Sequence, residues 1–500
     1  MAYTAFITRI KNLRQHPNAD RLQMGECFGN TVIVSMEYTD NQLGIYFPSD
    51  GQVSVAFAEA NNLLRKKDEN GNNIGGYMDE NKRNVTAIRL RGEKSDGLFL
   101  PLKSLETFGD ITTLHEGDRI DNFNGHEICC KYIPRRNHRQ GGVSQGNRTR
   151  KKKVNIAPLF VEHADTEQLA YNLGAFKIGD EIEITLKMHG TSQRTGYLPI
   201  LKGYRSKYPL YQAAINAVES GKKVGSFVEK LYNTAMNTAV PIYDWGYVSG
   251  TRRTVLENYD GGYYGSNEFR EQYSKFFEGK LWKGEEIYYE VVGFTHTGTP
   301  IMSTADNKKL NDKEFVKQYG QTTTFSYGCY PDGKKESKFQ MTSGTMHIGD
   351  ITSTVDDVKV YESAPQSDIY VYRMTMTNED GDMVEYTPDF MRYRCEQMGV
   401  KTVPVMIKFS IPKDSLISTD DFNPGEYVKV IAEEFYDGPD PIGKTHVREG
   451  VVVRILNRPK FCAYKHKNFS FKVLEGICKA EAEAPDMEEA EEVDTDGCNA

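Results

Sequence analysis

One short alternating stretch restricts more strongly than any other what this chain can fold into. In residues 181–187, EIEITLK, apolar and polar side chains alternate. A period of two predicts a strand with one buried face. Lys187 shares the parity of the polar residues, and Gly190 follows three positions later. The stretch therefore predicts a strand whose last amine points away from the core. Taken alone, it is explained most simply by a surface lysine before a turn.

Length and composition predict a multidomain protein with substantial cores. A chain of 500 residues is expected to form roughly two to four domains. Hydrophobic residues make up 38% and aromatic residues 11%, which argues against global disorder. The eight cysteines show no CxxC spacing, so neither a zinc site nor a disulfide framework is indicated. No apolar run is long enough to cross a membrane, and no signal peptide is recognisable. We expect a cytoplasmic protein without membrane contact.

The charge is distributed unevenly along the chain. The net charge of −8 argues against nucleic-acid binding as a whole-chain property. Residues 479–500 form an acidic tail, and without its nine acids the sum becomes +1. Residues 131–153 carry nine Lys or Arg and no acid. We interpret residues 126–156 as a basic linker that can contact phosphates in a salt-dependent manner.

The first 125 residues predict a small all-β domain. Short β-branched and aromatic runs alternate with turn residues, which favours an OB-like barrel. The segment from His16 to Leu22, HPNADRL, is similar to the signature at the start of tRNA-binding OB-fold domains. The same residues also make a good turn before a strand, so a purely structural role stays open.

Residues 157–478 predict a second, larger domain of the α+β class. Strands and helices interleave without a strict βαβ repeat. Helices are expected at 160–173, 208–220, 224–237 and 387–399, and a closing strand is expected at 469–475. Residues 296–366 form a long insert with little helical periodicity.

Four further stretches carry charge on strands in a way that could support chemistry. Glu290 lies at the centre of an apolar strand, and Glu449 begins another. Lys465 and Lys467 project from one face of a strand, because side-chain direction repeats every two residues. Arg252 follows a glycine turn. Each of these residues alone is explained by an ordinary cross-strand ion pair or by a surface charge.

In this order, the five stretches resemble the motifs of the covalent nucleotidyltransferase superfamily. The sequence from Lys187 to Gly190, KMHG, is similar to the nucleophile motif KxDG or KxHG, and Arg252 to the arginine motif. Residues 290–293, EVVG, match the third motif; residues 449–452, EGVV, match EGhV; and residues 465–467, KHK, match KxK. The stretches HGTSQR, RGEKSDG and KHKNFSFK resemble ATP-dependent RNA ligases with an N-terminal OB-fold domain. The resemblance covers residues 1–478. It implies a nucleotidyltransferase (ATP-grasp-like ligase) domain of antiparallel sheets with flanking helices.

This resemblance implies a covalent reaction at Lys187. The amine would attack the α-phosphorus of ATP, although an unperturbed lysine titrates near about 10.4. Lys465, Lys467 and a divalent metal would help to generate the free amine and are therefore expected to be catalytic. AMP would then pass from lysyl-AMP to the 5′-phosphate of an RNA end, and a 3′-OH would displace it.

The resemblance also implies a nucleotide site and a metal. The residues expected at the nucleotide are Leu186, Arg194, Arg252, Glu290, Tyr372, Glu449, Lys465 and Lys467. Glu449 and Glu290 would hold Mg²⁺ or Mn²⁺, since hard cations prefer carboxylate and water ligands. Three points stay open: Tyr370 could replace Tyr372, Arg194 could form only an ion pair, and Glu290 could bind the ribose. His189 stands where the motif usually has aspartate, which leaves the metal arrangement undecided.

Two other functions compete with an RNA ligase. A DNA ligase or a GTP-using capping enzyme normally carries its OB domain after the catalytic domain, whereas only the acidic tail follows KxK here. An RNA-binding protein with a degenerate nucleotidyltransferase fold is the non-enzymatic alternative, and the intact lysines and glutamates argue against it. We expect RNA ends, in a nicked duplex, as the partner, and no obligate protein partner.

Overall fold

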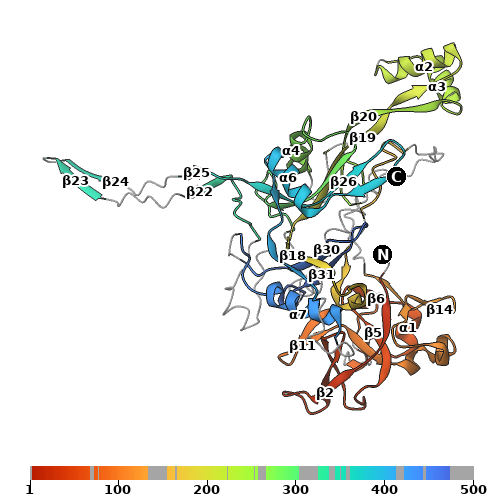
Figure 1. Ribbon diagram of the computed structural model, residues 1–500, viewed down its shortest axis with the longest axis vertical. Helices are drawn as coiled ribbons and strands as arrows, with labels where there is room; N and C mark the ends of the chain where they lie inside the picture. Colours follow the sequence, from red (N-terminus) through yellow and green to blue (C-terminus); the bar gives the residue numbers. More distant parts are fainter. Residues whose placement is uncertain are drawn as a thin grey trace.

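The computed structural model describes residues 3–67, 73–76, 78–132, 155–163, 166–221, 223–252, 254–256, 259, 266–302, 325–336, 344–348, 351–355, 361–412, 422–442 and 446–472. An N-terminal group of strands (red to orange in Figure 1) lies against a larger part formed by the rest of the chain. Most strand pairs are antiparallel and helices are few, as the α+β prediction requires. No helix in these described ranges is long and apolar enough to span a membrane.

The N-terminal part consists of short antiparallel sheets around an apolar core. Its three main sheets have the strand orders β12-β5-β1-β13, β2-β3-β4 and β16-β6-β9. The elements are β1 (Ala5–Arg9), β2 (Lys11–Gln15), β3 (Leu22–Cys27), β4 (Asn30–Ser35), β5 (Leu43–Phe47), β6 (Gly51–Val53), α1 (Val55–Ala60), β7 (Lys66–Lys67), β8 (Asn73–Gly75), β9 (Asn84–Val85), β10 (Ala87–Leu90), β11 (Glu93–Asp96), β12 (Leu98–Pro101), β13 (Arg119–Ile120), β14 (Asn122–Phe123), β15 (His126–Glu127) and β16 (Cys129–Lys131). Ile7, Ile45 and Phe57 are fully buried between them. The sheets do not join into one closed ladder within the described residues, so an OB-like barrel stays a prediction.

The larger part is built on two sheets. One has five strands in the order β17-β31-β30-β18-β29, and the other has six, β20-β19-β21-β26-β27 with β28 beside β26. Their strands are β17 (Glu167–Gln168), β18 (Glu181–Lys187), β19 (Thr191–Arg205), β20 (Val240–Gly250), β21 (Glu285–Gly293), β26 (Ser367–Thr377), β27 (Met383–Glu385), β28 (Lys401–Thr402), β29 (Val405–Ser410), β30 (Gly450–Ile455) and β31 (Ala463–Lys467). The chain passes directly from β18 in one sheet to β19 in the other, across residues 188–190.

Helices cover the outer face of each sheet. The alternation predicted for β18 is confirmed, because Ile182 and Ile184 are fully buried in a cluster with Val428 of α7 (Pro424–Tyr436). α4 (Glu268–Phe276) and α6 (Pro388–Met398) pack on β21 and β26 through a second cluster. Helix α6 begins where expected, because the Thr387 hydroxyl accepts a hydrogen bond from the Phe390 N–H. The faces turned toward each other carry polar side chains together with a third apolar cluster, which includes Leu186, Val292 and Tyr370.

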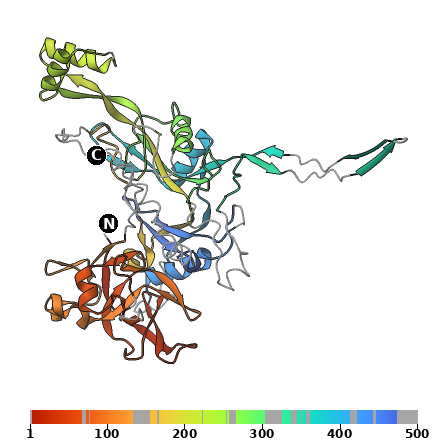
Figure 2. The ribbon, with the colours of Figure 1, turned by 180° about the vertical axis from the view of Figure 1, so that it is seen from behind.

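Two extensions leave this body. β19 and β20 continue outward as a long ribbon that carries α2 (Pro209–Glu219) and α3 (Ser226–Ala235), both at positions expected from the sequence (Figure 1). The insert at 296–366 contributes β22 (Lys334–Glu336), β23 (Gly344–Ile348), β24 (Ile351–Val355) and β25 (Tyr361–Ser363), which form the arm seen in Figure 2. The acidic tail and most of the basic linker lie outside the described residues.

Two local predictions are wrong. The described residues between 160 and 173 do not form an α-helix: β17 pairs in parallel with β31, and the short 3-10 turns Leu169–Tyr171 and Leu173–Ala175 follow. Tyr171 packs on Phe6 of the N-terminal part, so tertiary contacts override the helical pattern. The strand expected at 469–475 is also wrong, because residues 469–472 are helical. The Asn468 side chain caps that turn by accepting from the Phe471 N–H at 3.2 Å.

The N-terminal part docks close to β31 through sequences that the resemblance had singled out. Lys94 lies 4.9 Å from the ring centroid of Phe469, and Lys472 forms an ion pair with Asp96. The HPNADRL turn contacts the residue that precedes the RGEKSDG loop. His16 is buried, and its Nε2 lies 3.1 Å from the Leu90 carbonyl oxygen. The contacts of the HPNADRL turn are therefore structural contacts within the N-terminal part, which was one of the two roles that the sequence left open.

We predict that the ion pair between Arg394 and Glu285 anchors α6 to the six-stranded sheet. Its two contacts measure 2.8 and 2.7 Å, and both side chains are almost fully buried. Arg394→Ala leaves a buried carboxylate uncompensated and should lower the free energy of unfolding by about 3–5 kcal/mol, measured by urea denaturation. Lys401→Ala, which removes an exposed partner of Asp368, should cost less than about 1 kcal/mol. Equal losses in both variants would contradict the prediction.

Candidate active site

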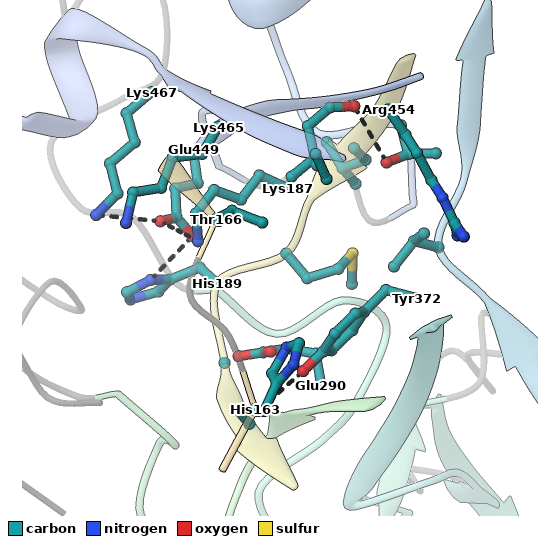
Figure 3. Close-up of a pocket in the computed structure, with 18 of the residues that line it drawn as sticks. His163, Thr166, Lys187, His189, Glu290, Tyr372, Glu449, Arg454, Lys465 and Lys467 are labelled. Atoms are coloured by element: carbon teal, nitrogen blue, oxygen red, sulfur yellow. Dashed lines mark hydrogen bonds and ion pairs between the residues drawn. The ribbon is translucent and has the colours of Figure 1, made fainter. Parts of the chain in front are cut away.

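A pocket lies between the two sheets, where their polar faces meet. The five-stranded sheet lines it with residues of β18, β30 and β31, and the six-stranded sheet lines it with residues of β19, β21 and β26. Figure 3 shows Lys187, Lys465 and Lys467 on one side, and Glu290, Tyr372 and His163 on the other. Seven cationic side chains line the pocket, namely Lys131, Lys187, Arg252, Arg392, Arg454, Lys465 and Lys467. Such a pocket suits a ligand with several negative charges.

Sheet register brings the three lysines together. Lys187 pairs with Gly450, and Gly450 pairs with Lys467 on the next strand. One row further along, Thr185 pairs with Val452, which pairs with Lys465. Residues opposite each other in neighbouring strands project to the same face. Residues separated by almost 280 positions in the chain therefore present their amines to one pocket, as the motif order had predicted.

The Glu449 carboxylate lies at the centre of this row. Its Oε1 is 2.8 Å from Lys187 Nζ and 3.5 Å from Lys467 Nζ, and its Oε2 is 3.6 Å from His189 Nδ1. Burial alone would raise the pKa of Glu449, but the charges of Lys187 and Lys467, with the His189 hydrogen bond, outweigh it and hold the pKa well below its usual value. Glu449 is therefore a carboxylate that positions the lysines.

Two motif glycines are required by close approach of the backbone. A Cβ atom on Gly190 would lie 2.4 Å from the Val291 carbonyl oxygen and 2.9 Å from Glu290 Cγ. A Cβ on Gly450 would lie 2.1 Å from the His466 carbonyl oxygen, and the φ of Gly450 is +152°. Both distances are far too short for a side chain. Gly190 lets the chain cross from one sheet to the other directly beneath Glu290.

Aromatic and neutral groups form the opposite wall. The Tyr372 hydroxyl lies 3.0 Å from the Ser192 hydroxyl, and its ring centroid is 5.9 Å from that of His163. Between the two tyrosines proposed from the sequence, the structure places Tyr372 in the pocket, whereas Tyr370 is buried in a hydrophobic cluster. The register of β26 against β21 shifts at this point, between the pairs Tyr288–Arg373 and Tyr289–Val371, so Tyr372 is the residue of β26 that has no direct partner on β21.

The predicted arginines separate into two groups. Arg252 lines the pocket. Arg194 does not: it is buried behind the pocket, donating to the Thr251 carbonyl at 2.9 Å and to the Glu286 carboxylate at 2.8 Å. Arg194 therefore forms a buried ion pair and does not line the pocket, which was the alternative left open for it by the sequence. Leu186 lines the pocket from β18 with a buried side chain.

His163 also lines the pocket, which its sequence context did not indicate. Its Nδ1 is 2.7 Å from an Arg373 guanidinium nitrogen. Because a guanidinium can only donate, Nδ1 must accept, which makes His163 neutral with its proton on Nε2. Arg373 is itself fixed by Glu385 at 3.0 Å. The sequence had placed His163 in a predicted helix at 160–173, so nothing indicated that it would reach the pocket.

The insert also reaches the site, which its sequence did not indicate. The His189 backbone N–H donates to the Tyr327 hydroxyl at 2.7 Å. Phe325 packs on the His189 ring with centroids 4.5 Å apart. Burial raises the pKa of Tyr327 far above its usual value, so the hydroxyl stays protonated. The root of the insert thus holds the loop that follows Lys187.

The carboxylates of the pocket suit a metal ion whose remaining coordination positions are filled by a bound ligand. No group of three His, Cys, Asp or Glu side chains that could hold a metal is found within the described ranges. Glu449 and Glu290 lie on different sides of the pocket (Figure 3). Mg²⁺ usually takes only one or two protein carboxylates and fills its remaining positions with water and substrate phosphates. Glu449, whose carboxylate lies 2.8 Å from Lys187 Nζ and 3.5 Å from Lys467 Nζ, is the carboxylate suited to this role, because these amines would meet the same phosphates.

Comparison with known proteins identifies solved structures of similar fold. No protein-family model and no curated protein sequence matches the chain. A structure of a Naegleria gruberi RNA ligase mutant with ATP and Mn aligns over 95% of this chain and 98% of its own, at 15% identity and a TM-score of 0.49. A mutant of the same ligase with AMP and Mn aligns over 94% and 98%, at 15% identity and a TM-score of 0.48. The same ligase with PPi aligns over 93% and 97%, at 15% identity and a TM-score of 0.47.

We predict that Gly190→Ala damages the crossing between the sheets. The added methyl group meets a backbone oxygen that cannot rotate away, so the free energy of unfolding should fall by about 1–3 kcal/mol, measured by chemical denaturation. Gly174→Ala is the matched control, because a Cβ there has no atom within 4 Å. That variant should be unchanged or up to about 1 kcal/mol more stable. A Gly190→Ala protein as stable as the control would refute the packing argument.

Proposed function

We propose that this chain is an ATP-dependent RNA ligase that joins a 3′-OH to a 5′-phosphate through a lysyl-AMP intermediate. One observation carries the proposal: Lys187 Nζ lies 2.8 Å from buried Glu449, with Lys465 and Lys467 in the same cationic pocket. A nucleophilic amine, cations for phosphate oxygens and an aromatic wall for a base occur together. The named neighbours were solved with ATP, AMP and Mn, but the proposal depends on these side chains.

In the first step, Lys187 would act as the nucleophile. Its amine loses a proton, and the nitrogen lone pair forms a bond to the α-phosphorus of ATP. The bond from that phosphorus to the bridging oxygen breaks, and pyrophosphate leaves with the electron pair. Lys465 and Lys467 would balance negative charge that develops on the phosphate oxygens. Glu449 keeps Lys187 and Lys467 in register before ATP binds.

The metal and the nucleoside have separate places in this proposal. Mg²⁺ or Mn²⁺, held by Glu449 together with nucleotide phosphates, would supply Lewis-acid stabilisation of the α-phosphate. Glu290 lies beside Tyr372 and His163 in Figure 3, away from Glu449. This position favours a role at the ribose over a shared metal site. Tyr372 would stack on adenine, and Arg252 would contact the nucleotide.

The later steps would transfer AMP to RNA. The 5′-phosphate attacks lysyl-AMP and releases the Lys187 amine, and a 3′-OH then displaces AMP to form the phosphodiester. We assign this catalysis to residues 157–478, and RNA contact to the OB-like residues 1–125 and the basic linker. A nicked duplex is the expected substrate, since it presents both ends together.

Covalent labelling tests the nucleophile. With α-labelled ATP and Mg²⁺ or Mn²⁺, the wild type should form a labelled adduct that survives denaturing gel electrophoresis. Lys187→Arg should form none, because a guanidinium keeps the positive charge beside Glu449 but stays protonated and cannot attack. Lys177→Ala, an exposed lysine before the same strand, should retain labelling. An unlabelled wild type, or a labelled Lys187→Arg protein, would overturn the assignment.

Base stacking is tested at Tyr372. Tyr372→Ala should raise the KM for ATP in the adenylylation step by about five- to a hundredfold, since stacking of a base on an aromatic ring contributes about 1–3 kcal/mol. Tyr372→Phe keeps the ring and removes only the hydroxyl that meets Ser192, so its KM should change less than about threefold. If both variants behave alike, Tyr372 does not stack on the base.

A further inference from the structure

The helical head at the end of the β19–β20 ribbon lies far from the pocket and exposes much of its surface. We define the head as residues 202–244, which contain α2 and α3. Figures 1 and 2 show it projecting away from both sheets and from the N-terminal part. It contributes no side chain to the pocket described above. Its conformation is therefore not explained by the adenylylation site.

The head has almost no core of its own. Within α2 and α3, only Ala214, Ile215 and Ala235 are buried. Its large apolar side chains point to solvent instead: Phe227 is 71% exposed, Leu210 60% and Tyr208 59%. Single exposed apolar residues are common on proteins, but a cluster of them on one small element marks an interaction site.

The head also carries an excess of exposed cations. Lys202, Arg205, Lys207, Lys223 and Lys230 are all exposed, against three exposed acids, Glu219, Glu229 and Asp244. Within the described part of the chain, none of these five cations forms an ion pair. Residues 202–244 hold six Lys or Arg against three acids, a net charge of +3, whereas the whole chain without the nine acids of its tail sums to only +1.

Basic and aromatic residues also alternate along one segment. Residues 202–211, KGYRSKYPLY, place Tyr204 between Lys202 and Arg205, and Tyr208 directly after Lys207. The Tyr208 and Tyr211 rings lie 5.5 Å apart, edge to face. Single-stranded nucleic acid is bound by this combination, because cations follow the phosphates and aromatic faces stack on bases. Protein interfaces, in contrast, are depleted in lysine.

We propose that the α2–α3 head is an RNA-binding surface that engages the strand beyond the ends held at the active site. This inference rests on the proposed ligase function, because the head would provide a second contact for RNA whose ends are held at the active site. Lys202, Arg205 and Lys207 contact backbone phosphates, and Tyr208 and Phe227 stack on unpaired bases. Adenylylation of Lys187 needs no RNA and is independent of the head.

The test measures RNA affinity and adenylylation separately on the full chain. Binding of a fluorescein-labelled RNA, a 5′-phosphorylated nicked duplex with a single-stranded overhang, is followed by anisotropy without ATP. The triple variant Lys202→Ala, Arg205→Ala, Lys207→Ala should bind more weakly and lower the slope of log Kd against log salt by about 2. Tyr208→Ala with Phe227→Ala should weaken binding at least about fivefold at any salt concentration. All variants should label with α-labelled ATP as the wild type does.

A variant of opposite sign serves as the matched control. Glu229→Gln removes an exposed acid from the same helix pair and should leave RNA affinity unchanged or increase it. RNA affinity unchanged in both the triple and the double variant would overturn the proposal. If those variants instead abolish self-association, measured by sedimentation, while RNA affinity stays constant, the head is a protein interface and the proposal is wrong. A wild type that binds RNA through the head but never labels would refute the ligase and leave the RNA surface standing.

Discussion

The contact between Glu449 and the two lysines is the interaction on which the arrangement of this site depends. A carboxylate that is 3% exposed requires compensating charge, and Lys187 and Lys467 supply it at 2.8 and 3.5 Å. The contact is possible only in one register, with Gly450 paired to Lys187 on one side and to Lys467 on the other. A shift of one residue would turn these lysines to the apolar face. Charge compensation and strand pairing therefore reinforce each other.

A second constraint joins the two sheets. Because β18 continues into β19 across three residues, the loop after Lys187 must pass close to β21, and Gly190 is the residue that allows it. The Tyr327 hydroxyl then fixes the His189 backbone N–H, and Phe325 and Phe471 pack on the His189 ring. With histidine in this position, the loop is held by aromatic packing and by the Glu449 contact together.

The sequence predicted the strands and the lysine row well, because both follow from local periodicity and from motif order. It could not predict contacts that depend on the path of the chain through space. The segment at 160–173 has a helical pattern, yet Tyr171 belongs to a core formed with Phe6 and Phe28. His163 lies in the pocket with its ring held by Arg373, a contact between residues 210 positions apart. Tyr372 lies at a register shift between β21 and β26 that no pattern of alternation reveals.

Three stretches outside the β18–β19 crossing, HPNADRL, RGEKSDG and KHKNFSFK, contact one another in the structure. HPNADRL supports the loop RGEKSDG, since His16 and Asn18 bond to the carbonyl oxygens of Leu90 and Arg91. That loop contacts KHKNFSFK, where Lys94 meets Phe469 and Asp96 pairs with Lys472. Phe471 lies between these two positions and packs on the ring of His189. A continuous set of contacts therefore leads from the HPNADRL turn to His189, two residues after Lys187, so these stretches help to hold the end of β18 in place.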